Sequence, residues 1–312
     1  MPELPEVHTT VTQLKKEILN LNITDSWSGY ESSYYLGKPN IKDRNYFKFF
    51  KNKVVGQKIL GISRLGKNII VELKEGYLVI HMKMTGHLLL GHYRITNKKD
   101  QKVLPEKWQN EHWVPDESKL SGLWDPFNRR IRFTISLSDK RTLVLSDVRK
   151  FANVRWVLNL SDDPSLKLLG PDMLGINYKK FKERIMLKPN GLIKTVLLNQ
   201  EVLAGIGNIY SDEALYLAGI HPESRVQKLP SDKSEKLFKS LKTVLEKGVK
   251  LKGDSTSDYR QPNGQPGNFQ HHHRVYRRKK EKCLEKKCSG RIQRKVVQGR
   301  SAHFCEKHQK MF

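Results

Sequence analysis

Three cysteines and a histidine near the end of the chain have the spacing of a metal site. Cys283 and Cys288 form one close pair, and Cys305 and His308 form a second pair after a spacer of sixteen residues. Two close pairs separated by a hairpin-length spacer are typical of a tetrahedral structural Zn2+ site with three thiolate ligands and one imidazole ligand. The sequence therefore predicts one structural zinc ion at these four residues.

The surroundings of this cluster leave the fourth ligand open. The segments 290–297 and 299–304 are predicted to be the two arms of a β-hairpin between the pairs. His303 and the run 271–273 are alternative imidazole donors, although the spacing favours His308.

The first residues could supply a nucleophile and two carboxylates. Pro2 is small enough to permit removal of Met1, which would leave a secondary amine as the first group of the chain. A free α-amine has a pKa of about 7.7–8.0 and can act as a nucleophile near neutral pH. Glu3 and Glu6 lie three residues apart on one face of the first helical turn. Acidic residues at that position also complement the helix dipole, which is their ordinary structural explanation.

A glycine-rich turn joins two helical patterns at residues 203–213. Gly205 and Gly207 permit a tight turn with open backbone N–H groups, and Asn208 is a suitable N-cap for the helix that follows. Open amides at the start of a helix attract phosphate, although most such turns are only turns.

The charge balance indicates a polyanionic partner. The 312 residues include 58 Lys and Arg against 32 Asp and Glu, a net charge of +26. Nucleic acid is the leading candidate and an anionic membrane surface the second, and composition alone does not choose between them. No apolar run of about 18 residues is present, so no membrane span is expected.

Other features indicate where the protein acts. The start of the chain lacks the basic and apolar regions of a secretory signal. Three cysteines, all after position 280, do not make a paired disulfide framework. A soluble cytoplasmic protein is expected, associated with the nucleoid in a bacterium.

The patterns that must position these residues predict a multidomain α+β protein. Apolar residues at helical spacing predict a leading amphipathic α-helix with Val7, Val11, Leu14 and Ile18 on its buried face. Short β-rich runs with turn residues between them then predict an antiparallel β-sandwich or barrel within residues 1–160. These runs are 68–73, 77–81, 131–137, 142–145 and 153–158. The stretch 94–130 breaks the pattern and is interpreted as a long loop or insertion.

Two further regions follow the strands. Residues 161–268 are predicted to form a helical domain that ends in a turn-rich loop, 253–268. Residues 269–312 are basic, contain all three cysteines and are too short to build a core without a staple such as a metal ion.

Six segments in this order resemble the formamidopyrimidine-DNA glycosylase family of the Fpg/Nei superfamily, and the resemblance covers nearly the whole chain. The segments are PELPEV (2–7), RLGKNIIVEL (64–73), HMKMTG (81–86), DVRKF (147–151), AGIGNIYSDEALYLAGIHP (204–222) and QGRSAHFC (298–305). The resemblance implies an N-terminal antiparallel β-sandwich with a leading α-helix, a central helix–two-turn–helix domain and a C-terminal β-hairpin zinc finger. It also implies a monomer that acts on damaged double-stranded DNA.

The implied activity is that of a bifunctional DNA glycosylase and AP lyase. The Pro2 nitrogen is expected to form a Schiff base with the deoxyribose, followed by β,δ-elimination. Glu3 is implied as the general acid/base at the sugar, Glu6 as a supporting carboxylate, and Lys67 as a group that assists proton transfer and contacts a phosphate. Arg300, on the hairpin that the zinc would hold, completes the implied catalytic set.

The same resemblance assigns residues to the DNA. Met84, Arg149 and Phe151 are implied to fill the gap left when the damaged nucleotide is extruded. Residues implied to contact the DNA backbone are His81, Lys194, Asn208 and Arg300. Met84, Arg149, Phe151 and the segment 263–269 match the branch that removes oxidised purines, such as 8-oxoguanine and formamidopyrimidines.

Several departures from the family pattern keep alternatives open. One cysteine pair is widened and the last ligand is His308, Lys83 stands where glycine is common, and DVRKF replaces the commoner DPRRF. The loop at 253–262 looks shortened, which leaves the lesion preference open. An endonuclease VIII-like enzyme for oxidised pyrimidines and a non-catalytic damaged-DNA-binding protein of the same fold remain the alternatives.

Overall fold

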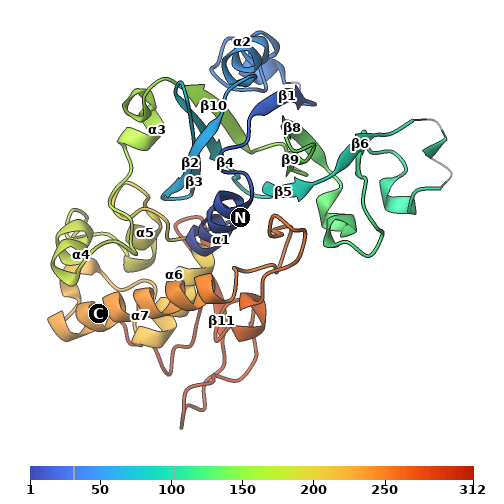
Figure 1. Cartoon of the computed structure of the whole chain (residues 1–312). Coiled ribbons are helices and arrows are strands. Elements are labelled where there is room, and N and C mark those ends of the chain that lie inside the picture. Colours follow the sequence, from blue (N-terminus) through green and yellow to red (C-terminus); the bar gives the residue numbers. More distant parts are fainter. Residues whose placement is uncertain (31, 98, 101–102) are drawn as a thin grey trace. The chain divides into compact units, whose positions relative to one another are not determined.

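The computed structural model describes residues 1–30, 32–97, 99–100 and 103–312, shown in Figure 1. Contacts divide the chain into two compact units. Unit 1 comprises Met1–Pro2, Glu6–Asp163 and Lys252–Asn268. Unit 2 comprises Glu3–Pro5, Pro164–Leu251 and Phe269–Phe312.

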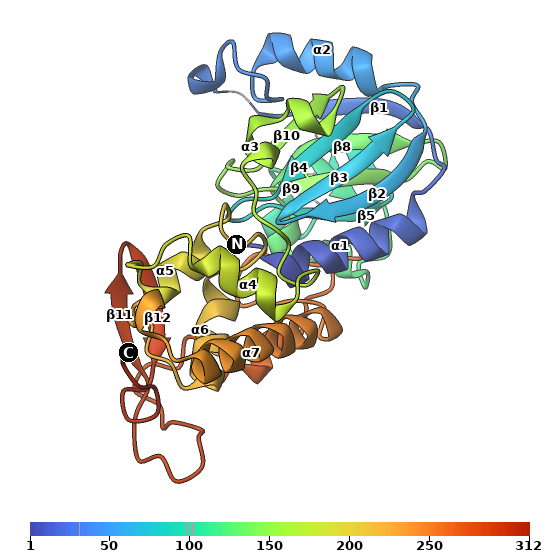
Figure 2. The same ribbon diagram turned by 90° about the vertical axis from the view of Figure 1, so that its left-hand side faces the viewer.

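Unit 1 contains two four-stranded antiparallel sheets, with strand orders β1-β8-β9-β5 and β10-β4-β3-β2. Figure 2 shows the strands of one sheet lying over those of the other. The strands are β1 (Ile23–Ser28), β2 (Ile59–Leu65), β3 (Asn68–Leu73), β4 (Tyr77–His81), β5 (His87–Gly91), β8 (Ile131–Leu137), β9 (Thr142–Ser146) and β10 (Asn153–Val157). The predicted antiparallel sandwich is therefore confirmed.

Side chains from both sheets and from two helices form the hydrophobic core of unit 1. The leading helix α1 (Leu4–Glu17) contributes Val7, Val11 and Leu14, as its periodicity predicts, and Ile18 follows directly after it. Helix α2 (Arg44–Val54) contributes Phe50 and Val54. Burying these apolar faces is the main stabilising contribution to the unit.

The stretch 94–130, predicted to be a long loop or insertion, contains short elements of secondary structure. Residues 98, 101 and 102 lie outside the described part of the chain. Strands β6 (Tyr93–Ile95) and β7 (Trp113–Pro115) pair antiparallel. The short 3-10 turns η3 (Glu106–Trp108), η4 (Gly122–Trp124) and η5 (Pro126–Asn128) also lie here, and η3 and η4 contribute to a small core. That core consists of Leu104, Trp108 and Val114, with Trp124 packed against it.

Unit 2 is mainly helical. Its helices are α3 (Pro164–Lys167), α4 (Tyr178–Ile185), α5 (Ile193–Leu198), α6 (Asn208–Ala218) and α7 (Ser231–Lys250). Helix α6 is buried along nearly its whole length, and it ends at Gly219 in the left-handed conformation that favours glycine. Leu4 belongs to this core, so the first turn of α1 packs in unit 2.

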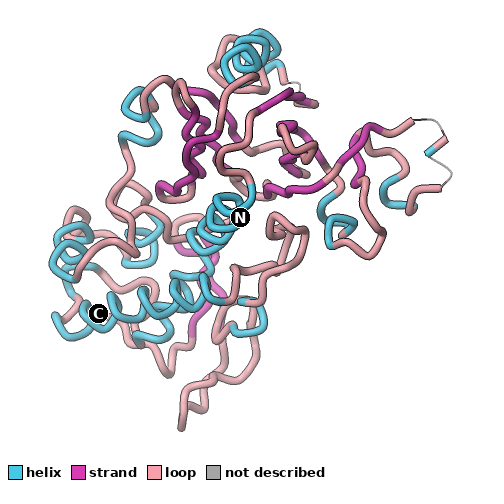
Figure 3. The backbone as a smooth tube through the Cα atoms, in the orientation of Figure 1, coloured by secondary structure: helices cyan, strands magenta, loops and turns pink. Residues whose placement is uncertain are grey.

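The end of the chain forms the predicted β-hairpin. Strands β11 (Gln293–Val297) and β12 (Arg300–Phe304) pair antiparallel around a turn in which Gln298 and Gly299 both have positive φ. Figure 3 shows that the chain between α7 and β11 is almost entirely loop. Other 3-10 turns in the described part of the chain include η1 (Ser33–Tyr35), η6 (Leu160–Asp162), η7 (Val226–Lys228) and η8 (Phe269–His272).

The segment Lys252–Asn268 groups with unit 1, although the sequence prediction placed all of it in the helical domain, 161–268. Its hydrogen bonds explain this grouping. Asp254 N donates to Glu6 Oε1 at 2.7 Å, and Leu90 N donates to Pro262 O at 2.8 Å. The predicted three-part division of the chain stays a prediction.

Candidate active site

Glu3, the predicted general acid/base, has a buried carboxylate held by the start of α6. Its Oε1 accepts a hydrogen bond from Ile209 N at 3.1 Å, and its Oε2 accepts one from Tyr210 N at 3.4 Å. A carboxylate at the positive end of a helix is electrostatically favoured. A Cβ atom at Gly207 would lie only 2.0 Å from Glu3 Cδ, so only glycine leaves room for this side chain. Two of the open amides of the glycine-rich turn therefore meet the chain's own carboxylate.

The two neighbours of Glu3 in the predicted catalytic set are also buried. Pro2 is buried in unit 1, and Glu6 is only 1% exposed. Besides the bond from Asp254, the Glu6 backbone oxygen accepts from Tyr259 Oη at 3.1 Å. Burial, followed by the charge of Glu6, raises the pKa of Tyr259, which therefore stays a hydrogen-bond donor at neutral pH. Sequence reasoning did not single out Asp254 or Tyr259, because no local pattern indicates their partner nearly 250 residues away.

Lys67 and His81 lie at neighbouring positions in the β10-β4-β3-β2 sheet. Lys67 is buried and precedes β3, and Asn68, the first residue of β3, is the register partner of His81 at the end of β4. Burial, with lesser effects of Lys83 and Lys67, lowers the pKa of His81 to about 3. His81 Nδ1 accepts a hydrogen bond from Lys83 N at 3.0 Å. A neutral ring that accepts at Nδ1 carries its proton on Nε2, where it can donate to an anion.

The Lys83 position has a backbone reason for favouring glycine. Lys83 has a φ of 54°, in the left-handed region where glycine is favoured. Lys83 therefore occupies a backbone conformation in which glycine would be less strained.

Met84, Arg149 and Phe151, the predicted wedge, are all exposed on two loops of unit 1. Met84 is 37% exposed and Phe151 is 46% exposed, and the Arg149 guanidinium lies 4.4 Å from the centre of the Phe151 ring. Large apolar side chains that stay exposed to water often mark a surface that contacts a ligand or partner.

A buried carboxylate joins the two wedge loops. Asp147 accepts from Thr85 Oγ1 at 2.6 Å, from Tyr30 Oη at 2.9 Å and from Ala152 N at 2.7 Å. The Lys42 ammonium donates to the Lys150 carbonyl at 2.7 Å, and burial lowers its pKa to about 8, against the opposing effect of Asp147. Thr85, Asp147 and Lys150 lie in segments that carry the family resemblance, whereas Tyr30, Lys42 and Ala152 had no sequence signal.

Lys194, expected to contact a DNA phosphate, lies inside unit 2 instead. Its side chain is fully buried, and its ammonium donates to Asp212 Oδ1 at 2.5 Å, Ser211 Oγ at 2.8 Å and Asn208 O at 3.1 Å. This placement differs from the expected surface contact, because three acceptors of α6 already surround the ammonium. Lys194 therefore supports the helix that carries Asn208.

Asp212, which pairs with Lys194, also binds the β-hairpin through its other carboxylate oxygen. Its Oδ2 accepts from His303 N and contacts His303 Nδ1, each at 3.0 Å. His303, one of the rival zinc ligands, is thus held by α6, while Arg300 is exposed at the start of the same strand. Asn208 is the first residue of α6, and its side-chain oxygen is buried without a hydrogen-bond partner among the described residues.

The three cysteine sulfurs lie together and could hold a metal ion. All three are within 4.8 Å of one another, and the Cys288 and Cys305 sulfurs are 3.8 Å apart. Two thiolates on one tetrahedral Zn2+, with Zn–S bonds of about 2.3 Å, are separated by about 3.8 Å. The sulfur positions therefore fit such an ion.

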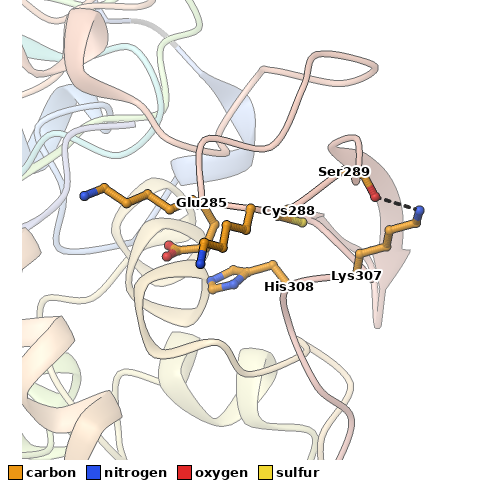
Figure 4. Close-up of a pocket in the computed structure, with 7 residues that line it drawn as sticks. Glu285, Cys288, Ser289, Lys307 and His308 are labelled. Atoms are coloured by element: carbon orange, nitrogen blue, oxygen red, sulfur yellow. Dashed lines mark hydrogen bonds between the residues drawn. The ribbon is translucent and has the colours of Figure 1, made fainter.

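His308 is not part of this group in the structure. Its Nε2 lies 2.8 Å from the Tyr216 carbonyl oxygen, and Figure 4 shows its ring directed away from the Cys288 sulfur. Tyr216 Oη instead lies 3.1 Å from the Cys283 sulfur. Burial raises the pKa of Cys283, but the hydrogen bonds with Tyr216, the Glu285 backbone and the other two cysteines together lower it below its ordinary value. The expected fourth ligand would have to turn toward the sulfurs.

Together, these features define a class of two-unit protein: a β-sandwich unit that includes the buried Pro2 and Glu6, and a helical unit that ends in a β-hairpin flanked by three clustered cysteines. Among the described residues, no helix is long and apolar enough to cross a membrane. Two family models match, the formamidopyrimidine-DNA glycosylase N-terminal domain over residues 1–154 and the formamidopyrimidine-DNA glycosylase H2TH domain over residues 169–260.

Full-length relatives give the same result. The chain is 31% identical over 320 residues to the formamidopyrimidine-DNA glycosylase of Solibacter usitatus, with 99% of this chain and all of the relative covered. It is 35% identical to that of Desulfitobacterium hafniense, with 98% of each chain covered. The chain belongs to the formamidopyrimidine-DNA glycosylase family, and it is a DNA glycosylase of base-excision repair.

Solved structures resemble the chain over nearly its whole length. A complex of Lactococcus lactis Fpg with DNA containing an abasic site has a TM-score of 0.77 and 30% sequence identity, and covers 99% of this chain and 100% of that one. A complex of the same enzyme with DNA containing N7-benzyl-Fapy-dG matches equally well.

Proposed function

We propose that this protein is a bifunctional DNA glycosylase and AP lyase that removes oxidised purines from double-stranded DNA, with the Pro2 nitrogen as nucleophile. The observation that carries the proposal is the buried Glu3 carboxylate, which adjoins Pro2 in the sequence and is held by two amides of α6. A carboxylate fixed beside a secondary amine is the pair that glycosidic-bond cleavage through an imine requires.

The chemistry begins once Met1 has been removed. The Pro2 nitrogen attacks C1′ of the deoxyribose, the bond from C1′ to the base breaks, and the base leaves with a proton. Glu3 supplies or accepts the proton at the sugar ring oxygen, and the opened sugar becomes a cationic imine on Pro2. Because a secondary amine can form only a cationic imine, the imine withdraws electrons from the sugar and promotes elimination.

Elimination then breaks the strand. Loss of a proton from C2′ expels the 3′ phosphate, and a second elimination expels the 5′ phosphate, leaving a one-nucleotide gap. Lys67 assists these proton transfers, and Glu6 supports the first turn of α1 through its bond with Asp254.

Damaged double-stranded DNA is the proposed partner. The net charge of +26 favours a polyanion, and the Lactococcus lactis enzyme binds DNA in its solved complexes. The neutral His81 ring, Asn208 and Arg300 are proposed to contact phosphates. Met84, Arg149 and Phe151 are proposed to fill the gap left by the extruded nucleotide.

A structural Zn2+ ion is proposed at Cys283, Cys288 and Cys305, with His308 as the fourth ligand after rotation of its ring. The ion would hold the hairpin that carries Arg300 and would take no part in the chemistry. Metal analysis of purified protein should give about one equivalent of zinc, and a Cys305→Ser variant should lose it. Retention of the full equivalent by that variant would contradict the ligand set.

Borohydride trapping tests the nucleophile. Wild-type protein incubated with an 8-oxoguanine·C duplex and borohydride should form a covalent adduct, and mass spectrometry should place it on Pro2. Pro2→Gly should trap poorly, whereas Pro189→Gly, a substitution after α4, should trap as well as wild type. No adduct from wild type would favour the non-catalytic alternative, and an adduct on another residue would overturn Pro2 as nucleophile.

The lesion preference needs a separate comparison. Excision rates on 8-oxoguanine·C and thymine glycol·A duplexes should favour the first substrate. A strong preference for thymine glycol would identify an endonuclease VIII-like specificity instead.

A further inference from the structure

The end of the insertion in unit 1 contacts three segments that bear predicted functional residues. Residues 122–130, called here the brace, include η4 and η5 and lie between β7 and β8. The brace has no role in the function proposed above, and the family resemblance assigns it none.

The first contact reaches the turn that carries Met84. Asn128 is fully buried, and its Oδ1 lies 3.0 Å from Nε2 of His87, which is also fully buried. His87 Nδ1 lies 3.2 Å from the Thr85 carbonyl oxygen. Asn128 Nδ2 donates to the Gly122 carbonyl at 3.0 Å, which closes the brace on itself. Both partner atoms are acceptors and a neutral imidazole has one N–H, so the shorter contact, to Asn128, is the hydrogen bond. His87 lies three residues after Met84, so the brace is bonded directly beside the Met84 turn.

The second contact reaches the loop that carries Arg149 and Phe151. Asp147 N donates to the Arg130 carbonyl at 2.8 Å, and Ser146 Oγ donates to the Phe127 carbonyl at 3.3 Å. Asp147 is the carboxylate that also binds Thr85, so both wedge loops share one hydrogen-bonded network with the brace.

The third contact reaches the segment that binds Glu6. Asp125 Oδ2 accepts from Arg260 Nε at 2.9 Å, and the Arg260 guanidinium lies 4.4 Å from the centre of the Phe127 ring. Arg260 is buried, and it also donates to the Tyr259 carbonyl at 2.8 Å. Tyr259 Oη in turn donates to the Glu6 backbone oxygen. A buried guanidinium needs a carboxylate partner, and the brace supplies it.

Backbone packing fixes this third contact further. A Cβ atom at Gly122 would lie 2.9 Å from the Asn263 carbonyl oxygen, so the two backbones approach closely. Gly264 has a φ of 81° and packs directly against the Gly122 carbonyl.

We propose that the brace is a positioning element for DNA repair, which sets the wedge loops through Asn128 and the Glu6 segment through Asp125. This inference rests on the proposed function, because it assigns the wedge and Glu6 their roles. The brace touches no predicted reacting atom, so its residues act through others. The two sets of contacts have separate effects: those of Asn128 affect lesion binding, and those of Asp125 affect the chemical step.

Two substitutions separate these effects. Asn128→Ala removes the bond to His87, and it should raise the Kd for a duplex with a tetrahydrofuran abasic analogue about tenfold. The Kd for the undamaged duplex should stay unchanged, because backbone contacts dominate there. Asp125→Asn keeps the size of the side chain and its cap on Phe127 N but removes its charge. It should lower the single-turnover excision rate about tenfold while the lesion Kd stays within about twofold.

Controls keep this test decisive. Asp116→Asn, a matched change at an exposed carboxylate of the insertion, should behave as wild type. Phe127→Leu removes the ring beside Arg260 from a half-exposed position, so the fold should tolerate it, and the rate should fall in the same direction as for Asp125→Asn. Hydrogen exchange of segment 252–268 should accelerate in Asp125→Asn without acceleration in β3 or β4.

The outcomes distinguish this inference from the proposed function. If wild type excises and traps normally but Asn128→Ala and Asp125→Asn match Asp116→Asn, the brace has no positioning role. Equal losses of binding to lesion and undamaged duplexes would also overturn it. If wild type forms no adduct, the proposed function fails, whereas faster exchange of segment 252–268 in Asp125→Asn would still support the structural part of the inference.

Discussion

The buried ion pair between Lys194 and Asp212 makes a quantitative prediction about unit 2. Both side chains are at most 1% exposed, and the pair distance is 2.5 Å. A Lys194→Met substitution keeps most of the side-chain length but leaves the Asp212 carboxylate buried without its cation. Removal of one partner of a buried pair costs about 3–5 kcal/mol. Because His303 still donates to Asp212 Oδ2, we expect the lower end, about 3 kcal/mol.

The distribution of tryptophans lets each unit be followed separately. All five tryptophans, at positions 27, 108, 113, 124 and 156, lie in unit 1, whereas helices α3 to α7 lie in unit 2. Tryptophan fluorescence therefore reports on unit 1, and circular dichroism at 222 nm reports largely on unit 2. For Lys194→Met the dichroism midpoint should fall by about 10 °C, while the fluorescence midpoint should stay within about 2 °C of wild type.

Two further variants test the reasoning behind the expected fall in the dichroism midpoint. Lys247→Met, at an exposed position of α7, should leave both midpoints nearly unchanged. Adding Asp212→Asn to Lys194→Met removes the stranded charge and should recover part of the loss. A dichroism midpoint for Lys194→Met within about 2 °C of that for Lys247→Met would refute the idea that this pair stabilises unit 2.

Three other predictions concern the site. Gly207→Ala should displace the Glu3 carboxylate and lower the excision rate at least about tenfold. Gly175→Ala, at a position where a Cβ atom has room, should leave the excision rate unchanged. Equal rates for the two variants would contradict this packing argument. Burial lowers the pKa of His81 in the folded protein to about 3, whereas a histidine in the unfolded chain has a pKa of about 6.5. As the pH falls, the unfolded chain therefore binds a proton at His81 before the folded protein does. The contribution of His81 to the free energy of unfolding is complete above about pH 6.5 and is lost below it. Denaturation by urea at pH 7.5 and 5 should show this loss for wild type and a smaller one for His81→Gln. A strong zinc chelator should lower the dichroism midpoint without changing the tryptophan midpoint, and a shift of both would argue against a metal role confined to the hairpin.

Local features of the fold followed from the sequence because they depend on neighbouring residues. The helical spacing of Val7, Val11 and Leu14, the short β-rich runs and the hairpin arms around Gly299 all appear where expected. Periodicity determines which face of an element is apolar, and turn residues determine where it ends. The cysteine spacing likewise predicted a cluster that the structure brings together.

The partners of the buried polar groups did not follow from the sequence. Lys194 was expected to contact the DNA backbone, but three acceptors of α6 surround its ammonium. His308 had the spacing of a ligand, but its ring meets the Tyr216 carbonyl. Neither outcome is encoded in a short motif, because each depends on which atoms the packed helices bring within hydrogen-bond distance.

The chain by itself determined the family, the leading helix, five strands of the sandwich, the terminal hairpin and the residue types available for chemistry. Only the tertiary structure decided that Glu3 caps α6, that Glu6 binds the segment at Asp254, and that the insertion supplies a carboxylate to Arg260. The physical reason is that a buried charge or carbonyl must find a partner wherever folding places one. In this protein those partners lie more than a hundred residues away along the chain.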